Sequence, residues 1–172
     1  MTIRRLVPSD AVAYRELMLE AYEQHPDAFT SSRSERAALA GSWWESRLAV
    51  AETAGEVVLG AFENGQLAGV AGVAFEPREK ARHKATLFGM YVPAAYRQRG
   101  LGRALVVAAL ALAKSRAGVI VVQLTVTHGN RSAQALYEQC GFVQFGLEPL
   151  AVAIGSTFVS KAHMWRRLDK EI

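Results

Sequence analysis

A turn rich in glycine and arginine stands between an apolar segment and a long run of alanine, leucine and valine, in "YVPAAYRQRGLGRALVVAALALAKSRAG" from Tyr91 to Gly118. The backbone N–H groups at the start of a helix lack intrahelical partners and carry a partial positive charge, so they can bind a phosphate. Gly100 and Gly102 let a ligand approach the backbone because they have no Cβ. The three arginines around them can add bidentate donors. The stretch therefore predicts a phosphate-binding turn.

The charges of the chain are unevenly distributed. Residues 1–79 contain 7 Lys/Arg and 12 Asp/Glu, residues 80–137 contain 9 Lys/Arg and no acid, and residues 138–172 contain 4 of each. A basic segment of this length favours a polyanionic ligand, such as a phosphorylated cofactor or a nucleic acid. The alternative is a basic face that only contacts solvent.

Other phosphate-binding motifs fit the turn poorly. A Walker A loop requires Gly-x-x-x-x-Gly-Lys-Ser/Thr, which the chain lacks. A dinucleotide fingerprint requires a third small residue near Leu105 and an acid about twenty residues later, where the chain has none.

Composition limits the class of protein. The 172 residues, of which 51% are apolar, are enough for a single domain, residues 1–172, with a substantial core. The longest apolar run, Ala104 to Ala113, is too short to cross a bilayer, and "MTIRRLVPSD" lacks the apolar region of a signal peptide. A lone cysteine, Cys140, allows neither an internal disulfide nor a multi-cysteine zinc site. We therefore expect a cytoplasmic protein without a metal or a membrane partner.

Hydrophobic periodicity and turn residues predict an α/β (α+β) fold with the order β-α-α-β-β-β-α-β-α-β-β. Asn64-Gly65 between two apolar runs predicts a hairpin, and a second turn is expected near Gly155-Ser156. The expected helices are "PSDAVAYRELMLEAYEQHP", "SERAALAGSWWESRLA" with a break at Gly41, the segment that ends near Gly118, and "NRSAQALYEQC" before Gly141. The expected strands are "TIRRLVP", the two halves of the first hairpin, "HKATLFGMYV", "VIVVQLTV" and the two halves of the terminal hairpin.

Two motifs resemble those of the GNAT superfamily of acetyl-CoA-dependent N-acetyltransferases. "RQRGLG", residues 97–102, matches the pattern Arg/Gln-x-x-Gly-x-Gly/Ala, and "NRSAQALYEQCGF", Asn130 to Phe142, matches Asn-x-x-Ala-x-x-Leu-Tyr-x-x-x-Gly-Phe. The resemblance implies a mixed sheet of about seven strands flanked by about four helices. It also implies that the strands "FGMYV" and "VQLTV" separate into a V-shaped cleft that holds acetyl-CoA.

The resemblance assigns roles to individual residues. The backbone groups of Met90 and Val92 would pair with the pantetheine arm, and the amides from Gln98 to Arg103, with Ala104, would hold the pyrophosphate. Asn130 would form a hydrogen bond with the cofactor, and Ser132, Ala133 and Leu136 would line it. Tyr137 would be the general acid that protonates the departing thiolate, since a phenol has a pKa of about 10; the alternative is an ordinary core aromatic. The expected cofactor-binding residues are Met90, Tyr91, Val92, Arg97, Gln98, Arg99, Gly100, Leu101, Gly102, Arg103, Ala104, Asn130, Ser132, Ala133 and Leu136.

The general base has no clear candidate, because no acid occurs between Lys80 and Tyr137. A lysine-like amine, with a pKa of about 10.4, is seldom neutral at neutral pH, whereas an α-amine with a pKa near 8 often is. An acceptor with a weakly basic amine is therefore favoured. The base stays unassigned; the residues considered, each of which could equally be a solvated surface group, are Glu35, Glu76, Glu79, His83 and His128.

The acceptor is expected to contact the segment from Tyr22 to Leu48, which is acidic overall and contains Phe29, Trp43 and Trp44. An acidic, aromatic rim would attract a cationic amine by charge and cation–π contact. Both tryptophans could instead be core residues, although neighbouring residues of a helix cannot both face inward.

The leading interpretation is an enzyme that transfers an acetyl group from acetyl-CoA directly to a primary amine of a small molecule or of a protein or peptide. The alternatives are a non-catalytic acyl-CoA-binding or sensing module, and a nucleic-acid-binding domain, which is weakened by the lack of aromatics among the basic residues. An acetyl-cysteine intermediate on Cys140 is disfavoured, because it would need a base beside the thiol and no histidine forms a recognisable sequence motif with Cys140. The terminal segment "STFVSKAHMWRRL" is compatible with a homodimer but does not require one.

Overall fold

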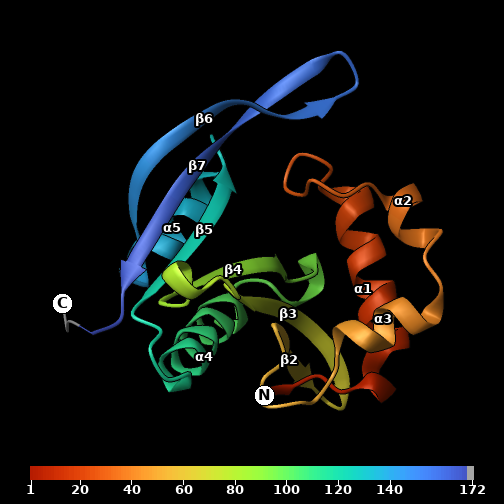
Figure 1. Ribbon diagram of the computed structural model, residues 1–172. Helices are drawn as coiled ribbons and strands as arrows, with labels where there is room; N and C mark the ends of the chain where they lie inside the picture. The colour runs from red at the N-terminus through yellow and green to blue at the C-terminus, as the bar shows by residue number, and fades with distance from the viewer. Residues whose placement is uncertain (170–172) are drawn as a thin grey trace.

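A single mixed β-sheet forms the centre of the molecule in the computed structural model, which describes residues 1–169 (Figure 1). Its strand order is β1-β2-β3-β4-β5-β7-β6, and every neighbouring pair is antiparallel except β4 and β5. The mixed sheet expected from the sequence is therefore confirmed. The strands are β1 (Thr2–Arg5), β2 (Glu56–Glu63), β3 (Gln66–Phe75), β4 (Lys84–Tyr91), β5 (Val121–Thr127), β6 (Val143–Ile154) and β7 (Thr157–Arg167).

Five α-helices lie within the described residues: α1 (Ala11–Gln24), α2 (Arg33–Ala37), α3 (Gly41–Arg47), α4 (Leu101–Ser115) and α5 (Arg131–Gln139). The expected helix "SERAALAGSWWESRLA" is divided into α2 and α3, and α3 begins at Gly41, the predicted break. None of the helices in residues 1–169 has both the length and the hydropathy needed to span a membrane.

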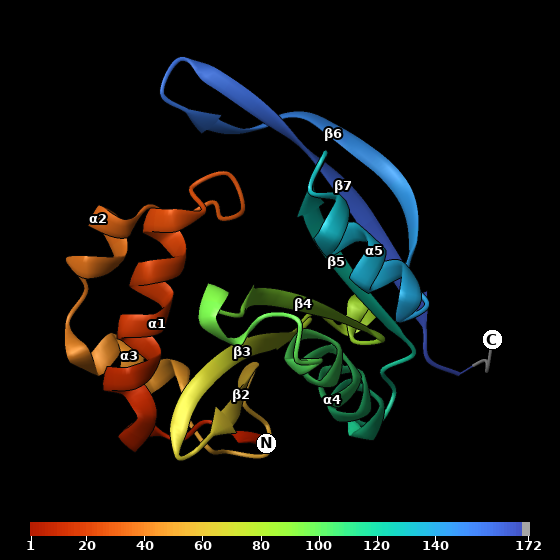
Figure 2. The same cartoon turned by 180° about the vertical axis from the view of Figure 1, so that it is seen from behind.

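Both predicted hairpins are present. Asn64 and Gly65, with φ angles of 50° and 77°, connect β2 to β3, as an Asn-Gly turn with two left-handed residues should. The two residues Gly155 and Ser156 connect β6 to β7. Figure 2 shows that this terminal hairpin extends well beyond the rest of the sheet.

Apolar side chains cover both faces of the sheet, because consecutive residues of a strand point to opposite sides. Val58 of β2 belongs to a buried cluster with Tyr14 of α1 and Trp44 of α3. Its neighbour Leu59 belongs to a second cluster that includes Leu105 of α4. The helices α1 and α3 thus cover one face of the sheet and α4 covers the other.

The parallel strands β4 and β5 pair over a short distance only. Their register consists of Lys84 with Val121, Ala85 with Val122 and Thr86 with Gln123. Past Thr86, β4 remains paired with β3 up to Tyr91, whereas β5 remains paired with β7 up to Thr127. The expected V-shaped separation of the two central strands is therefore confirmed.

A β-bulge lies in the part of β4 that is no longer paired with β5. Val70 of β3 pairs with Tyr91 and Gly72 pairs with Phe88, so Ala71 alone stands opposite the two residues Gly89 and Met90. Gly89 has a φ of 58°, a left-handed conformation that favours glycine. The nearest atom to a Cβ at this position would be Cε of Met18, 4.0 Å away, so backbone conformation and not space requires the glycine.

We predict that Gly89→Ala lowers the free energy of unfolding by about 1 kcal/mol, because an L-residue is strained at this φ. Gly55→Ala is the matched control, since a Cβ there meets no atom within 4 Å and its φ is outside the left-handed region. Urea unfolding followed by circular dichroism measures both variants. Equal stabilities for the two would show that the bulge does not depend on glycine.

Candidate active site

Two connected cavities occupy the gap between β4 and β5. The larger, of about 890 Å³, is lined by the ends of both strands, the turn before α4, and α5. The smaller, of about 290 Å³, extends toward α1, α2 and α3. Both volumes suit small-molecule sites. The cavities meet at the residues that line both: Ala28, Phe29, Met90, Thr127, Asn130, Ala133 and Tyr137.

Most residues expected to bind the cofactor line the larger cavity. The strand β4, the turn before α4 and the first turns of α4 and α5 bring them together from distant parts of the chain. They are Met90, Tyr91, Val92, Arg97, Gln98, Gly100, Leu101, Gly102, Asn130, Ser132, Ala133 and Leu136.

Three expected residues are not on the wall of this cavity. Arg99 forms an ion pair with Glu63, with 3.0 Å between Nη1 and Oε2. The Arg103 side chain is exposed on α4, and Ala104 lies in the first turn of that helix, where its N–H donates to the carbonyl of Gly100. Successive helical side chains point in different directions, so a continuous segment cannot place all of them on one wall.

The turn before α4 has the geometry of an anion site. Gly100 is the N-cap with a φ of 78°, and Gln98 also has a positive φ, 61°. No side chain caps the helix, so the N–H groups of its first turn remain available to a ligand. A Cβ on Gly102 would lie 3.3 Å from both Leu136 and Met90. Glycine thus keeps the floor of the cavity open.

Asn130 organises the start of α5. Its Oδ1 accepts from the backbone N–H of Ala133, at 3.3 Å, and from Oγ of Ser132, at 3.2 Å. These contacts form an N-cap, as expected for asparagine at this position. Because Oδ1 is used for capping, the side-chain amide NH₂ is the group of Asn130 that can donate to a ligand.

Tyr137 lies where the two cavities meet. Its hydroxyl donates to Sδ of Met90, at 3.5 Å, and its ring packs edge-to-face on Phe142 with 6.0 Å between centroids. Burial raises the pKa of Tyr137 to about 12. The hydroxyl therefore keeps its proton at neutral pH and is a hydrogen-bond donor at the junction, although it is a weaker acid than a free phenol.

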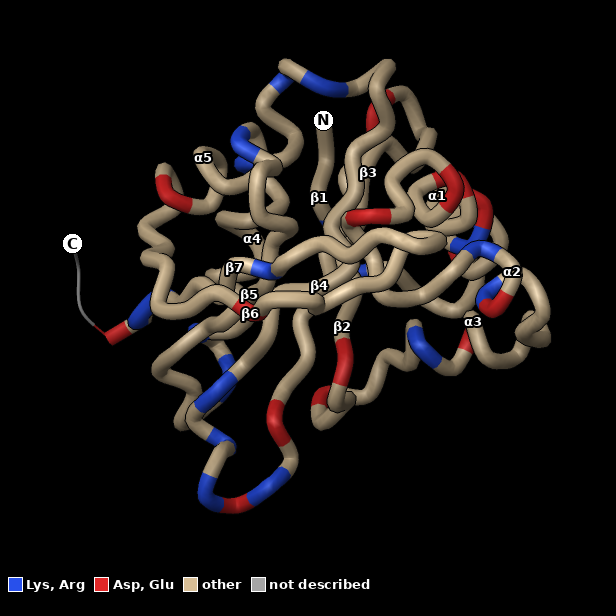
Figure 3. Tube along the Cα trace, turned by 90° about the horizontal axis from the view of Figure 1, so that it is seen from above, with Lys and Arg blue, Asp and Glu red and all other residues tan. Residues whose placement is uncertain are grey.

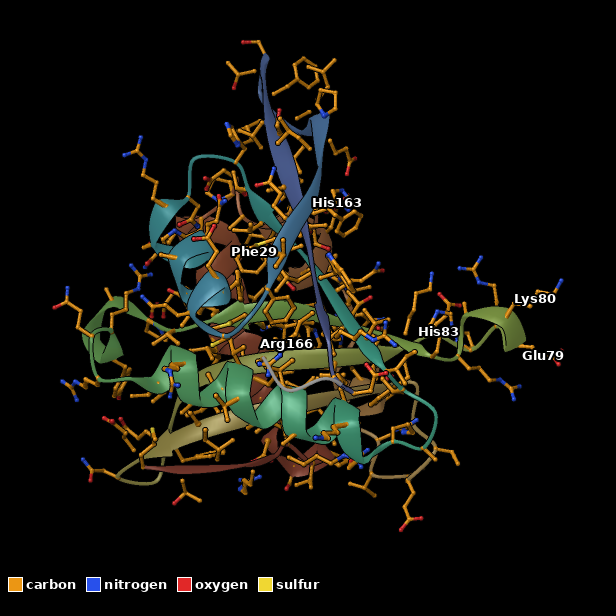
Figure 4. All side chains as sticks on the ribbon, turned by 90° about the vertical axis from the view of Figure 1, so that its left-hand side faces the viewer. Phe29, Glu79, Lys80, His83, His163 and Arg166 are labelled. Carbon is orange, nitrogen blue, oxygen red and sulfur yellow. The ribbon has the colours of Figure 1, made fainter. Side chains whose placement is uncertain are left out.

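The expected bases are scattered. Glu35 accepts from the backbone N–H of Ser32 and caps α2, and Glu76 is bound by the neighbouring Arg78. Figure 4 shows Glu79 and His83 beyond the far end of β4. Of the five candidates, His128 alone lines either of the two connected cavities, and it lies on the wall of the larger one. The structure assigns none of them as the base.

The three aromatic residues expected at the acceptor site are placed differently. Phe29 lines both cavities. Trp44, only 1% exposed, packs into the core against Tyr14, with 5.6 Å between ring centroids. Trp43 is half-buried beside it and lines neither cavity. Of the two adjacent tryptophans only one is fully buried, as helix geometry requires.

The wall of the smaller cavity is basic, so the expected acidic rim is wrong at this position. Arg36, Arg47 and Lys161 line the cavity, and its lining includes no Asp or Glu. The composition of the segment was misleading because none of its acids lines the smaller cavity: Glu35 is exposed and caps α2, and Asp27 lines the larger cavity instead.

Lys161, only 6% exposed, was not recognised in the sequence as a site residue. Its Nζ donates to the carbonyls of Asp27 and Ala28, at 3.3 and 3.1 Å, and to Oγ1 of Thr127, at 2.9 Å. Burial lowers the pKa of this amine. These bonds hold the loop before Phe29 against β5 and β7. The residues of the larger cavity that the sequence analysis missed are His25, Asp27, Ala28, Tyr96, Thr127, Gly129 and Val159.

The basic residues of the central segment do not share one surface. Lys80 is in the loop before β4, at the opposite end of that strand from Arg97, and Figure 3 shows the Lys and Arg positions distributed over several loops and helices. Such separation does not provide the continuous track that a nucleic-acid backbone needs.

Cys140 is a buried free thiol whose pKa is raised by burial, so it is a poor nucleophile. It lines neither cavity. Within residues 1–169, no cluster of three or more His, Cys, Asp or Glu side chains is arranged to hold a metal ion.

Comparison with known proteins gives consistent results. Residues 14–142 match the family model described as "Acetyltransferase (GNAT) family". An acetyltransferase of the GNAT family from Streptococcus pneumoniae has 27% sequence identity and a TM-score of 0.87, with 96% of this chain and 98% of that chain covered. The ribosomal-protein-alanine N-acetyltransferase from Brucella melitensis has 26% identity and a TM-score of 0.79, with 98% and 100% covered.

A third structure, yncA from Salmonella typhimurium with its cofactor acetyl-CoA, has 24% identity and a TM-score of 0.80, with 100% of this chain and 96% of that chain covered. At this identity the likeness concerns the fold. No curated protein shows significant similarity to the chain.

Proposed function

The chain belongs to the acetyltransferase (GNAT) family and is an acetyl-CoA-dependent N-acetyltransferase, and we propose that it transfers the acetyl group directly to a primary amine where its two cavities meet. The observation that carries this proposal is the shared wall of the cavities. Met90 and Tyr137 line both, so a thioester in the larger cavity and an amine in the smaller would meet beside them.

Acetyl-CoA fits the larger cavity by its chemistry. The backbone of Met90 and Tyr91 at the end of β4, and of Val92 just after it, is not paired with β5 and can pair with the amides of the pantetheine arm. The uncapped start of α4 can bind the pyrophosphate, with Arg97 on the same wall. Contacts from Arg99, Arg103 and Ala104 to the cofactor stay predictions.

The proposed reaction balances with the groups at the junction. The neutral amine attacks the thioester carbonyl, whose oxygen is polarised by backbone N–H groups at the bulge near Met90. The C–N bond forms, the C–S bond breaks, and Tyr137 donates its proton to the departing thiolate. The proton lost by the amine goes to solvent, and Tyr137 then regains its own proton from solvent. None of these steps requires a metal.

We predict that Tyr137→Phe lowers kcat by about 10²-fold or more, as loss of a general acid does, with little change in the Kd for CoA. The phenyl ring preserves packing on Phe142. Thiol release with acetyl-CoA and a broad amine panel measures kcat, and calorimetry measures CoA binding. An unchanged kcat would remove the acid role, and absence of turnover by the wild-type protein with every amine would favour the non-catalytic alternative.

The pH profile is the control for the Tyr137 role. Because the pKa of Tyr137 is about 12 in the folded protein, its proton is retained as the amine acceptor deprotonates. We therefore expect kcat/KM of the wild type to rise with pH and then level off. A fall in kcat/KM between about pH 8 and pH 10 that disappears in the phenylalanine variant would contradict the raised pKa.

We predict that Gly102→Asp abolishes CoA binding, since it adds a side chain and a negative charge to the floor of the larger cavity. Ala111→Asp is the matched control, because it adds the same charge to an exposed position of the same helix. Calorimetric titration with CoA distinguishes the two. Wild-type affinity in Gly102→Asp would show that the phosphates bind elsewhere.

A homodimer and a cytoplasmic location complete the proposal. The terminal hairpin exposes large apolar side chains, which commonly mark an interface, and no strand within residues 1–169 pairs with the outer side of the edge strand β6. The exposed residues are Val143, Phe145, Leu147, Leu150, Phe158 and Trp165. Sedimentation velocity should detect dimers at micromolar concentration; monomers at all accessible concentrations would exclude this role for the hairpin.

A further inference from the structure

We propose that the acceptor is a small amine that also carries a carboxylate, an amino acid in the simplest case, and that Arg36 and Arg47 bind this carboxylate. The inference specifies the acceptor class of the transfer reaction proposed above and rests on that reaction. The basic side chains of the smaller cavity, Arg36, Arg47 and Lys161, have no role in the acetyl-transfer steps described above.

The two arginines line the part of the smaller cavity that is not shared with the larger one. Met90 and Tyr137 line both cavities, whereas Arg36 and Arg47 line only the smaller one. An acceptor in this cavity therefore has one end at the junction, where acetyl transfer occurs, and the other end at two guanidinium groups. A molecule with an amine at one end and an anion at the other matches this polarity.

The guanidinium groups are held in place by aromatic rings. The Cζ atoms of Arg36 and Arg47 are 4.6 and 5.2 Å from the ring centroid of Trp43, and Cζ of Arg47 is also 4.8 Å from that of Phe88. Contact with a ring face orients a guanidinium and leaves the N–H groups on its edge available. Two such groups can bind a carboxylate with several charge-assisted hydrogen bonds. Trp43 is thus a positioning residue for the arginines.

The positive charge of the cavity is only partly neutralised. Arg36 takes part in none of the ion pairs found between described residues. Arg47 lies beside Glu56, with 3.2 Å between Nε and Oε2, but its buried Nε has no partner in hydrogen-bonding geometry. An anionic ligand in the cavity would complete the neutralisation of the two guanidinium groups and is therefore favoured over a cationic one.

Two tyrosines add neutral donors to the same wall. Tyr14 and Tyr22 line only the smaller cavity, and burial raises the pKa of both hydroxyls despite the opposing charges of Arg36 and Arg47. Both hydroxyls are therefore protonated at neutral pH. Lys161 also lines the smaller cavity, as do Arg36 and Arg47. These positive charges disfavour a polyamine or an isolated lysine side chain as acceptor, because either would bring further positive charge into the cavity.

The volume of the cavity supports a small acceptor. At about 290 Å³ it is at the lower limit of small-molecule sites. The amine and the carboxylate must both fit within it, which favours a single amino acid over a peptide whose carboxylate is several residues from its amine.

The first test compares amino acids with their amides in a thiol-release assay with acetyl-CoA. Amidation removes the carboxylate charge and lowers the pKa of the amine, which by itself would increase the fraction of neutral, reactive amine at neutral pH. We expect kcat/KM to be at least about tenfold higher for the preferred amino acid than for its amide, since charge-assisted bonds to arginine are lost. Equal or faster turnover of the amides would overturn the inference.

The second test uses Arg36→Gln, with Arg33→Gln as the matched control. Both variants remove one positive charge from α2, but Arg33 pairs with Glu23 and does not line the cavity. We expect Arg36→Gln to lower kcat/KM for the amino acid by about ten- to a hundredfold and to reduce its advantage over the amide. The Kd for CoA should be unchanged in both variants. The same kcat/KM for the amino acid in both variants would contradict the role of Arg36.

A binding measurement separates failure of this inference from failure of the proposed function. Calorimetry with N-acetyl amino acids and their amides, in the presence of CoA, requires no turnover. Binding that needs the carboxylate and is weakened by Arg36→Gln supports the inference, whether or not any amine is acetylated. A failure to acetylate any amine would contradict the transferase proposal and not this inference. Turnover of cationic amines without any carboxylate-dependent binding would leave the transferase proposal intact and overturn this one.

Discussion

The separation of β4 from β5 is the constraint on which the rest of the structure depends. Three residue pairs join these parallel strands, after which each strand is held only by its outer neighbour. The bulge at Gly89 and Met90 lies in the unpaired part of β4, beyond the last pair at Thr86. A closed sheet would satisfy more backbone groups internally, whereas the open one leaves the N–H and C=O groups of β4 available to a ligand. The cleft, its two cavities and the position of Tyr137 all follow from this opening.

Both cavities of the cleft have positively charged surroundings. At the larger cavity, helix N–H groups and Arg97 provide positive potential for phosphates; at the smaller cavity, Arg36, Arg47 and Lys161 provide it from side chains. No Asp or Glu side chain lines the smaller cavity, including the wall that it shares with the larger one. Positive surroundings disfavour an ammonium ion and lower the pKa of a bound amine. The absence of an acid, which left the base unassigned, is thus compatible with an acceptor that is deprotonated on binding.

Local patterns in the sequence predicted the framework well. Asn64-Gly65 specified a hairpin, Gly41 a helix boundary, and "RQRGLG" the turn that lines the larger cavity. These signals are local because each depends on a few neighbouring dihedral angles. The acceptor side was not predictable in this way. Arg36 and Arg47 come from different helices, and Lys161 contacts a carbonyl 134 positions earlier in the chain. Composition suggested an acidic rim, but side-chain direction, set by tertiary packing, decides which charges reach the cavity.

The account is tested most directly by a crystal structure of the protein with CoA. We predict that the pyrophosphate lies on the first turn of α4, that the pantetheine arm pairs with the β4 backbone from Met90 to Val92, and that the sulfur lies at the junction of the cavities beside the Tyr137 hydroxyl, with the smaller cavity still open. Cofactor bound outside the cleft, or a sulfur atom separated from Tyr137 by the cavity wall, would contradict the account.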